Sequence, residues 1–377
     1  MPLPARSTRL AALLLASVAS LASVALAAET PPPLPGVASV VDMGLVRQNR
    51  YVQCRDGTYS ARVGDKAVWT FNDTCLGKGG VLGDQFIDNT LAWTRKFDAS
   101  GGIFLDHDLK DTQNVPVRFV PLTAWEQQVN ARKAPNEIAI WPGHLVDDPA
   151  RHRELIFYGA VYRGSDIGFT GIGAGIAVAT PDFKTVTRPP ESLDPNAAEP
   201  NYMWAKGEIS YTGGYVLVGD MLYCYGGEGK NLRTLVHVAR VPLADALDKT
   251  KWTYWDGTSW STDASTSKWV YEGGAAGDTI FWSDYVGAYM TVYMPFATND
   301  VYYRVANHPE GPWSAPALLF TAQQGADTSY AARVHTESAE NGGQVQYVTY
   351  VKNTGFLSQQ LPLVKVTFAK AVSAPVR

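Results

Sequence analysis

Short apolar and aromatic segments recur along almost the whole chain, and each is bounded by Gly, Pro, Asn or Asp. Such segments are typical of β-strands, and the residues between them are typical of turns. Helical patterns are scarce, and the best helix candidate is short, at 244–247. We expect strands at 67–72, 137–141, 154–162, 175–179, 215–225, 235–241, 279–282, 289–294, 301–305 and 344–351. The sequence therefore predicts an all-β fold.

Several of these segments share a loose pattern, in which an apolar strand is followed by a turn and a second aromatic strand. The segments 155–162, 215–225 and 280–293 are the clearest examples. Dividing about 310 residues into four-stranded blades of roughly 60 residues gives five blades, which lies within the range of known propellers. We predict a five-bladed β-propeller, and a β-sandwich or a β-helix is the alternative that the spacing leaves open.

The N-terminus has the features of a secretory signal peptide. Arg6 and Arg9 precede an uncharged apolar run at 10–26, and Ala25-Leu26-Ala27 matches the small-x-small pattern of a cleavage site. The run is short and rich in Ala and Ser for a membrane span, although an uncleaved anchor is the alternative. We predict a signal peptide at 1–27, a Pro-rich spacer at 28–37 and a single propeller domain at 38–377. The mature protein is then secreted or periplasmic and has no membrane span.

Composition narrows the class of partner. Charged residues make up 18% of the chain, the net charge is -4, and no run of Lys and Arg is present, which argues against nucleic acid. Eleven Trp and nineteen Tyr suit a polysaccharide, because flat aromatic faces pack against sugar rings. The alternative for any single aromatic residue is that it fills the sheets. No cofactor is predicted, and the oligomeric state stays open.

One hairpin carries most of the chemical information. Gly64-Asp65 has the composition of a two-residue turn, so Val63 faces Lys66. Asp56 then lies opposite Asp73, and Cys54 lies opposite Cys75. Both pairs lie on the same face of the ribbon, because their positions along each strand differ by two.

Two carboxylates that face each other across a ribbon repel, so one of them should have a raised pKa. A protonated carboxyl beside an ionised one is the arrangement that glycosidases use for general acid catalysis. The alternative is that Asp56 and Asp73 end strands or accept hydrogen bonds from backbone amides. Cys54 and Cys75 are placed to form a disulfide that holds the same ribbon, and export permits one. Cys224 would then be free, although three cysteines allow three different single bridges.

Other candidate residues are weaker. Asp88 and Glu208 lie among apolar residues, where an unpaired carboxylate is costly, so each is a candidate third acid or substrate ligand. His144 is a candidate substrate contact, and a structural role is the alternative for all three. The sequence has no zinc-protease signature, no nucleophile-elbow motif and no phosphate-binding loop, and no metal site is predicted.

Several motifs together resemble a known family. They are Arg55-Asp-Gly-x-x-Ser60, Val68-Trp-Thr-Phe-Asn-Asp-Thr74, Asn89-Thr-Leu-Ala-Trp93, Ile138-Ala-Ile-Trp-Pro142, Val238-Ala-Arg-Val-Pro-Leu243 and the segment 301–313. The chain resembles a bacterial family of domains of unknown function that is similar to the endo-D-arabinanases of mycobacterial cell-wall arabinan. The resemblance implies a five-bladed propeller and a glycosidase whose acids are Asp56 and Asp73. The chain departs from the family pattern at Asn72, where a Gly is expected, and in its Cys54/Cys75 pair.

These observations together predict an exported glycoside hydrolase that cleaves furanoside linkages of an arabinan-like polysaccharide. Asp73 is assigned first as nucleophile or base and Asp56 as acid, and the reverse assignment stays open. Trp69, Phe71, Trp93 and Trp141 are expected walls of the sugar site. The alternative is a non-catalytic propeller that binds glycans or other surface partners.

Overall fold

The computed structural model describes residues 29–81, 83, 85–132, 137–164, 168–189, 202–355 and 357–370. The predicted signal peptide lies outside the described residues. All the described strands belong to the compact unit that begins at Pro31. No helix in these ranges is long and apolar enough to cross a lipid bilayer.

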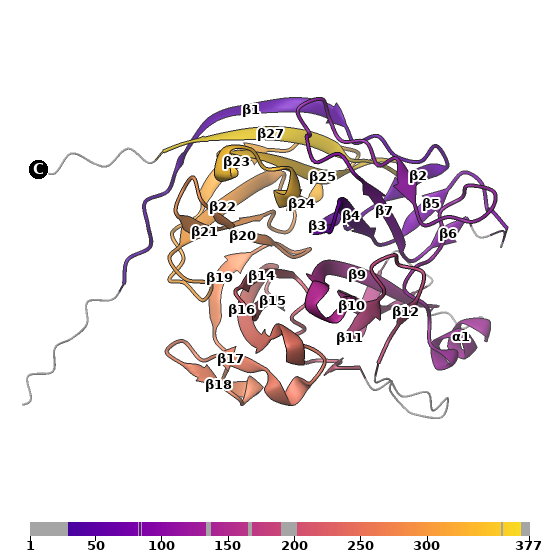
Figure 1. Cartoon of the computed structure of the whole chain (residues 1–377), viewed down its shortest axis with the longest axis horizontal. Coiled ribbons are helices and arrows are strands. Elements are labelled where there is room, and N and C mark those ends of the chain that lie inside the picture. The colour runs from indigo at the N-terminus through magenta and orange to yellow at the C-terminus, as the bar shows by residue number, and fades with distance from the viewer. Residues whose placement is uncertain are drawn as a thin grey trace, which may run out of the picture. The chain divides into compact units, whose positions relative to one another are not determined.

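Five antiparallel sheets surround a common centre and form a five-bladed β-propeller, which confirms the predicted fold (Figure 1). Blade 1 contains β3 (Tyr59–Val63), β4 (Lys66–Phe71), β7 (Thr90–Thr94) and β8 (His107–Asp108). Blade 2 contains β9 (Glu137–Asp148), β10 (Arg153–Arg163), β11 (Phe169–Ala179), β12 (Val186–Thr187) and β13 (Trp204–Ala205). Blade 3 contains β14 (Gly214–Val218), β15 (Met221–Lys230), β16 (Arg233–Pro242), β17 (Thr253–Trp255), β18 (Trp260–Ser261) and β19 (Trp269–Gly273).

The last two blades follow the same plan. Blade 4 contains β20 (Thr279–Ser283), β21 (Ala288–Tyr293), β22 (Asp300–Ala306) and β23 (Ala317–Thr321). Blade 5 contains β24 (Tyr330–Val334), β25 (Val345–Gly355), β26 (Ser358–Gln360), β27 (Pro362–Ala369) and β1 (Gly36–Leu45). β1 pairs with β27, so the N-terminal strand supplies the outer edge of the last blade and closes the ring (Figure 1). This strand begins inside the segment that the sequence assigns to a spacer.

Each pair of neighbouring blades encloses its own hydrophobic cluster. Val68 and Leu91 of blade 1 pack with Ile138 of blade 2, and equivalent clusters fill the other four junctions. Burial of these side chains provides the main driving force for closing the ring. Because a blade is covered on both faces, its middle strands are buried along most of their length, as in β4, where only Lys66 is partly exposed.

Tight turns connect the inner strand of two blades to the second strand. The turns Gly64-Asp65 and Gly219-Asp220 each contain two residues, and both glycines have positive φ, 56° and 58°. Glycine adopts this conformation without the steric cost that other residues meet. The strand that the sequence predicts at 215–225 is therefore two strands, β14 and β15.

Helices are few in the described ranges. The α-helix α1 (Ala124–Ala131), which the sequence analysis did not predict, is begun by a capping box between Thr123 and Glu126. The predicted helix at 244–247 is a 3₁₀ turn at Leu243–Asp245. Further 3₁₀ turns occur at Pro149–Arg151, Lys249–Lys251, Ala264–Thr266, Thr336–Ser338 and Asn341–Gly343.

Candidate functional site

The ribbon that carries the two aspartates has the predicted register. Within blade 1, Val63 pairs with Lys66 and Tyr59 with Thr70. The ribbon continues into a small sheet formed by β2 (Val52–Arg55), β5 (Thr74–Leu76) and β6 (Phe86–Ile87). There, Cys54 pairs with Cys75 and forms the predicted disulfide, with a Cα–Cα distance of 4.9 Å.

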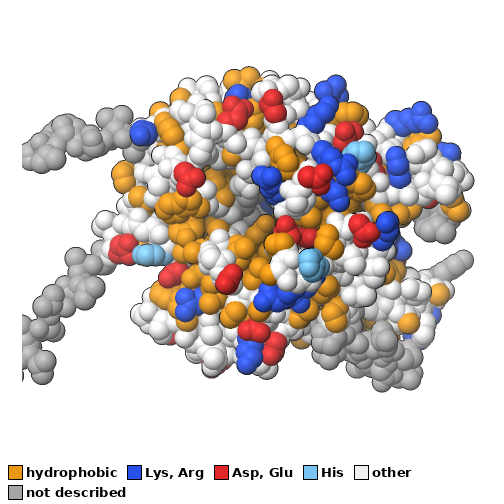
Figure 2. Space-filling model, in the orientation of Figure 1, with side chains coloured by type: hydrophobic (Ala, Val, Ile, Leu, Met, Phe, Trp, Pro, Cys, Tyr) orange, Lys and Arg blue, Asp and Glu red, His pale blue; other side chains and the backbone are white. Residues whose placement is uncertain are grey.

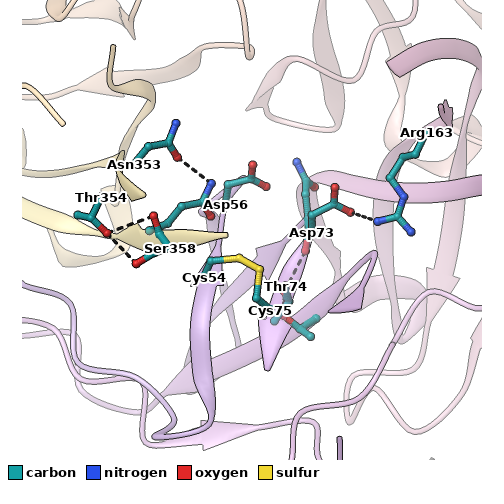
Figure 3. Close-up of a disulfide and its surroundings, with 12 residues drawn as sticks. Cys54, Asp56, Asp73, Thr74, Cys75, Arg163, Asn353, Thr354 and Ser358 are labelled. Carbon is teal, nitrogen blue, oxygen red and sulfur yellow. Dashed lines mark hydrogen bonds and ion pairs between the residues drawn. A yellow bond between two sulfur atoms is a disulfide. The ribbon is translucent and has the colours of Figure 1, made fainter. Parts of the chain in front are cut away.

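Asp56 and Asp73 lie between these two paired stretches, where the amide of Asn72 donates to the Asp56 carbonyl at 2.9 Å. Gly57 and Thr58 both have positive φ, 87° and 51°, which interrupts the ribbon after Asp56 and separates β2 from β3. Figure 3 shows both carboxyl groups on one side of the disulfide. The structure therefore brings together the pair that the sequence predicted.

Asp56 is held from blade 5. Its Oδ2 accepts a hydrogen bond of 2.6 Å from the hydroxyl of Tyr330, and its Oδ1 is buried without a hydrogen-bond partner among the described residues. Burial raises the pKa of Asp56, while the Tyr330 hydrogen bond and the Arg333 charge act in the opposite direction. Asp56 therefore keeps one carboxyl oxygen without a protein partner among the described residues.

Asp73 is held from blade 2. Its Oδ1 accepts a hydrogen bond from Nε1 of Trp141 at 3.0 Å. The same oxygen accepts a second one from Nη1 of Arg163 at 2.8 Å (Figure 3). The side chain is 22% exposed, so it is open to a ligand. Burial raises the pKa of Asp73, the Arg163 charge lowers it, and the Asp56 charge raises it.

Burial is thus the largest cause of both pKa shifts, whereas the sequence analysis expected repulsion to raise the pKa of only one carboxyl. Repulsion from Asp56 contributes to the pKa of Asp73 but ranks below burial. Both carboxyl groups therefore lie in the range where proton exchange near neutral pH is possible.

A cavity of about 760 Å³ adjoins the ribbon and has Asp56 in its wall. Every blade or the segment leading into it contributes lining residues, among them Asp56, Tyr59, Trp141, Phe169, Thr212, Ala276, Phe296, Tyr330 and Arg333. The volume is large enough for several sugar units by comparison with small-molecule sites of about 300–1,000 Å³. Figure 2 shows a hollow near the centre of one face, where acidic and basic side chains are interspersed among hydrophobic ones.

Two residues brace the inner strands beside this cavity. The guanidinium of Arg333 lies 4.0 Å from the ring centre of Tyr59, and the Tyr59 hydroxyl donates to the Ala276 carbonyl at 2.7 Å. Arg333 also donates to the carbonyl groups of Ala276 and Gly277. Blades 1, 4 and 5 are thereby tied together next to Asp56.

Of the four aromatic residues expected to wall the sugar site, only Trp141 lines the cavity, and Phe71 is fully buried. Trp69 is 1% exposed and stacks on His335 between blades 5 and 1, with ring centres 3.8 Å apart. Trp93 stacks on His107 at the hydrophobic cluster between blades 1 and 2. The position of neither residue supports a role as a sugar wall, because the faces of a middle strand are covered by the adjoining blades.

The other candidate ligands also lie away from the cavity. Asp88 is fully buried, pairs with Arg118 and accepts a hydrogen bond of 2.8 Å from the Ile140 amide. Glu208 is exposed and forms an ion pair with Lys249 at 2.8 Å. Their partners satisfy both carboxylates, so their surroundings do not support substrate binding.

His144 lines a different cavity of about 300 Å³. Its Nδ1 lies 3.1 Å from the Thr212 carbonyl, and burial lowers its pKa to about 3, so the ring is neutral and Nδ1 donates.

Arg55, the residue before Asp56, forms an ion pair with Asp108 at 3.3 Å. Among the described residues it forms no ion pair with Asp56 or Asp73. No cluster of three or more metal-ligating side chains occurs within the described ranges.

Sequence reasoning missed the residues that hold the aspartates and rim the cavity. Tyr330, Arg163 and Arg333 approach the ribbon from other blades, and Phe169 and Phe296 follow no motif. An aromatic residue in a predicted loop is the only signal that the sequence offers for the two phenylalanines.

A family model for a domain of unknown function, DUF4185, matches residues 48–354. The chain belongs to the DUF4185 family. The DUF4185 match contains both aspartates and the disulfide, whereas β1 and β27, which close the ring, lie outside it. The sequence analysis predicted a resemblance to a family of domains of unknown function, and this match confirms it. No curated protein matches the sequence.

Solved structures share the DUF4185 chain's fold. One is a protein from Bacteroides ovatus ATCC 8483 named as a candidate hydrolase, at 15% identity, with a TM-score of 0.56 over 86% of this chain and 87% of that one. Another is Zg3597 from Zobellia galactanivorans, a family 117 glycoside hydrolase, at 11% identity, with a TM-score of 0.54 over 89% of this chain and 92% of that one. At these identities the similarity shows the propeller fold alone.

Proposed function

We propose that the protein is an exported glycoside hydrolase that cleaves furanoside linkages of an arabinan-like polysaccharide. The observation that carries this proposal is the pair Asp56 and Asp73. The two carboxyl groups occupy opposed positions of one ribbon, Asp56 lines the cavity, and burial raises the pKa of both. A pair of this kind retains one proton near neutral pH, as glycoside hydrolysis requires.

The hydrogen-bond donors suggest the division of roles. Asp73 accepts from a guanidinium and an indole, and these donors stabilise its negative charge, so it acts as nucleophile or base although burial raises its pKa to about 7, above the value of about 6 for Asp56. Asp56 accepts only from the neutral hydroxyl of Tyr330 and acts as the acid. Asp56 gives its proton to the glycosidic oxygen, while Asp73 attacks the anomeric carbon or activates a water for that attack. Separation of the carboxyl groups by about 5 Å would give retention of configuration.

The substrate class follows from the cavity and from the sequence motifs. The wall combines aromatic side chains with hydroxyl and backbone groups, which suits a neutral sugar chain. The furanoside and the arabinan-like polymer come from the resemblance of the motifs around Asp56 and Asp73 to those of endo-D-arabinanases. Export is consistent with a polymer in or beyond the cell envelope and with the Cys54–Cys75 disulfide.

A non-catalytic glycan-binding protein is the second candidate. The observation that favours it is the pair of donors on Asp73, because a carboxylate whose Oδ1 already accepts from Arg163 and Trp141 is a weaker nucleophile. Such a protein would bind the polysaccharide and leave it intact.

Incubation with D-arabinan, L-arabinan, a galactan and mycobacterial arabinogalactan, followed by chromatography of the products, separates the two candidates. New oligosaccharides from an arabinan are the expected result. Binding to the polymers with no product after long incubation would reject the hydrolase and support the binding protein.

A further inference from the structure

Two phenylalanine side chains of the cavity wall are exposed to solvent. Phe169 is 63% exposed and Phe296 is 59% exposed, and both are part of the cavity wall. Leaving a large aromatic side chain in water forgoes about 1.5–3 kcal/mol of transfer free energy. Exposed apolar surface beside polar groups in a cavity is typical of a ligand-binding surface.

Phe169 lies beside the groups that hold Asp73. It pairs across β10 and β11 with Arg163, and its ring meets that of Trp141 edge to face at a centroid distance of 4.7 Å. Arg163 and Trp141 are the two donors to Asp73. A sugar ring that stacks on Phe169 therefore lies next to Asp73.

Phe296 lies on the side of Asp56. It belongs to the loop between β21 and β22 of blade 4, and Asn299 of the same loop accepts a hydrogen bond of 2.8 Å from the Ser329 amide. Ser329 directly precedes Tyr330, whose hydroxyl holds Asp56. The loop that carries Phe296 is thus fixed to the strand that positions the other carboxyl.

We infer that Phe169 and Phe296 are stacking platforms for sugar rings on the two sides of the cleaved linkage, so that the site takes an extended, neutral polysaccharide. The inference rests on the proposed function. The two rings come from blades 2 and 4, whereas both aspartates come from the ribbon of blade 1. Neither platform provides a charge, so recognition depends on the apolar faces of the sugar rings.

The experiment measures binding separately from hydrolysis. Phe169→Ala, Phe296→Ala and the double variant are prepared in an Asp56→Asn background, and their affinity for D-arabinan is measured by affinity gel electrophoresis. Phe104→Ala is the matched control, because Phe104 is 42% exposed and lies outside the cavity wall. Each platform variant should bind about tenfold more weakly than the control, since 1.4 kcal/mol of lost contact is a factor of ten.

Kinetics on the active protein give the second measurement. The same substitutions should raise KM for the polymer about tenfold, whereas Phe104→Ala should leave KM unchanged. Thermal unfolding temperatures equal to that of the control show that the fold is intact.

The outcomes separate the inference from the proposed function. Hydrolysis by the unsubstituted protein together with unchanged affinity in the platform variants would overturn the inference alone. Weakened binding in those variants without hydrolysis by the unsubstituted protein would support the platforms and reject the hydrolase. Absence of binding to D-arabinan by the Asp56→Asn protein would overturn the inference.

Discussion

The hydroxyl of Tyr330 donates a hydrogen bond of 2.6 Å to Oδ2 of Asp56, although 274 positions separate the two residues. Gln359 donates to the same hydroxyl oxygen at 2.8 Å, so the Tyr330 hydrogen is directed at the carboxyl. Asp73 is held in contrast by Arg163 of blade 2. Neighbouring carboxyl groups of one ribbon are therefore positioned by two different blades.

The activity of the hydrolase should follow a bell-shaped pH profile with its maximum between about pH 6 and pH 7. The two carboxyl groups titrate as a pair, with pKa values raised to about 6 and about 7. Below this range the base is protonated and above it the acid is ionised, so activity falls on both sides. A kcat/KM profile that is flat from pH 4 to pH 9 would contradict the pair mechanism.

Removal of the cation beside Asp73 should move the acidic limb. Arg163 lowers the pKa of Asp73, so Arg163→Met raises that pKa and shifts the loss of activity at low pH to higher pH. The measurement is the kcat/KM profile of the variant beside that of Arg62→Met, an exposed arginine at the far end of the hairpin. A shift of the basic limb instead would reverse the roles assigned to the two aspartates.

Loss of the Tyr330 hydroxyl should move the opposite limb. The hydrogen bond lowers the pKa of Asp56, so Tyr330→Phe raises that pKa and extends activity to higher pH, because the acid keeps its proton longer. The ring remains, so the cavity wall keeps its shape. An unchanged basic limb would show that Asp56 is not the acid.

The disulfide should stabilise the fold as well as the site. Its cysteines are 21 positions apart, and closing a loop of this size stabilises a protein by about 3 kcal/mol. The double variant Cys54→Ala/Cys75→Ala should lose about this much free energy of unfolding in urea. Reducing agent should destabilise the unsubstituted protein and leave the double variant unaffected, and equal sensitivity of both would contradict the prediction.

A second carboxyl pair makes the stability depend on pH. Glu154 is fully buried opposite Asp147, and burial, followed by the Asp147 charge, raises the pKa of Glu154 to about 8. The folded state therefore prefers the protonated form, and stability falls as pH rises from the ordinary pKa of 4.5 to about 8. Glu154→Gln should unfold at a higher temperature than the unsubstituted protein at pH 8 and show little difference at pH 4.

The matched control for this prediction is Glu208→Gln. Glu208 is an exposed residue of the ion pair with Lys249, so its substitution should have a small effect that is similar at both pH values. A gain at pH 4 as large as the gain at pH 8 for Glu154→Gln would contradict the pH dependence.

Local patterns in the sequence were sufficient to predict the hairpin and its register. The turn at Gly64-Asp65 sets the register, and the register alone brings Asp56 to Asp73 and Cys54 to Cys75. The spacing of strands and turns also predicted five blades, although it left a β-sandwich or a β-helix open. These predictions succeed because each depends on residues that are close in the chain.

Contacts between blades could not be predicted in the same way. Trp69 has the composition of a sugar-binding residue, yet the packing of blade 5 on blade 1 buries it against His335. Arg163 and Tyr330 reach the aspartates only because the ring closes, and no local pattern records which residues then meet. Burial of the two carboxyl groups, the main cause of their raised pKa values, is likewise a property of the closed ring.

The central claim is that Asp56 and Asp73 together cleave a furanoside polymer, and release of reducing ends from D-arabinan tests it most directly. The assay compares the unsubstituted protein with Asp56→Asn, Asp73→Asn and the control Asp65→Asn, an exposed residue in the turn of the same hairpin. We predict that each site variant loses activity by a factor of about 10² to 10⁴, while the control keeps it. Activity in both site variants close to that of the control would contradict the claim.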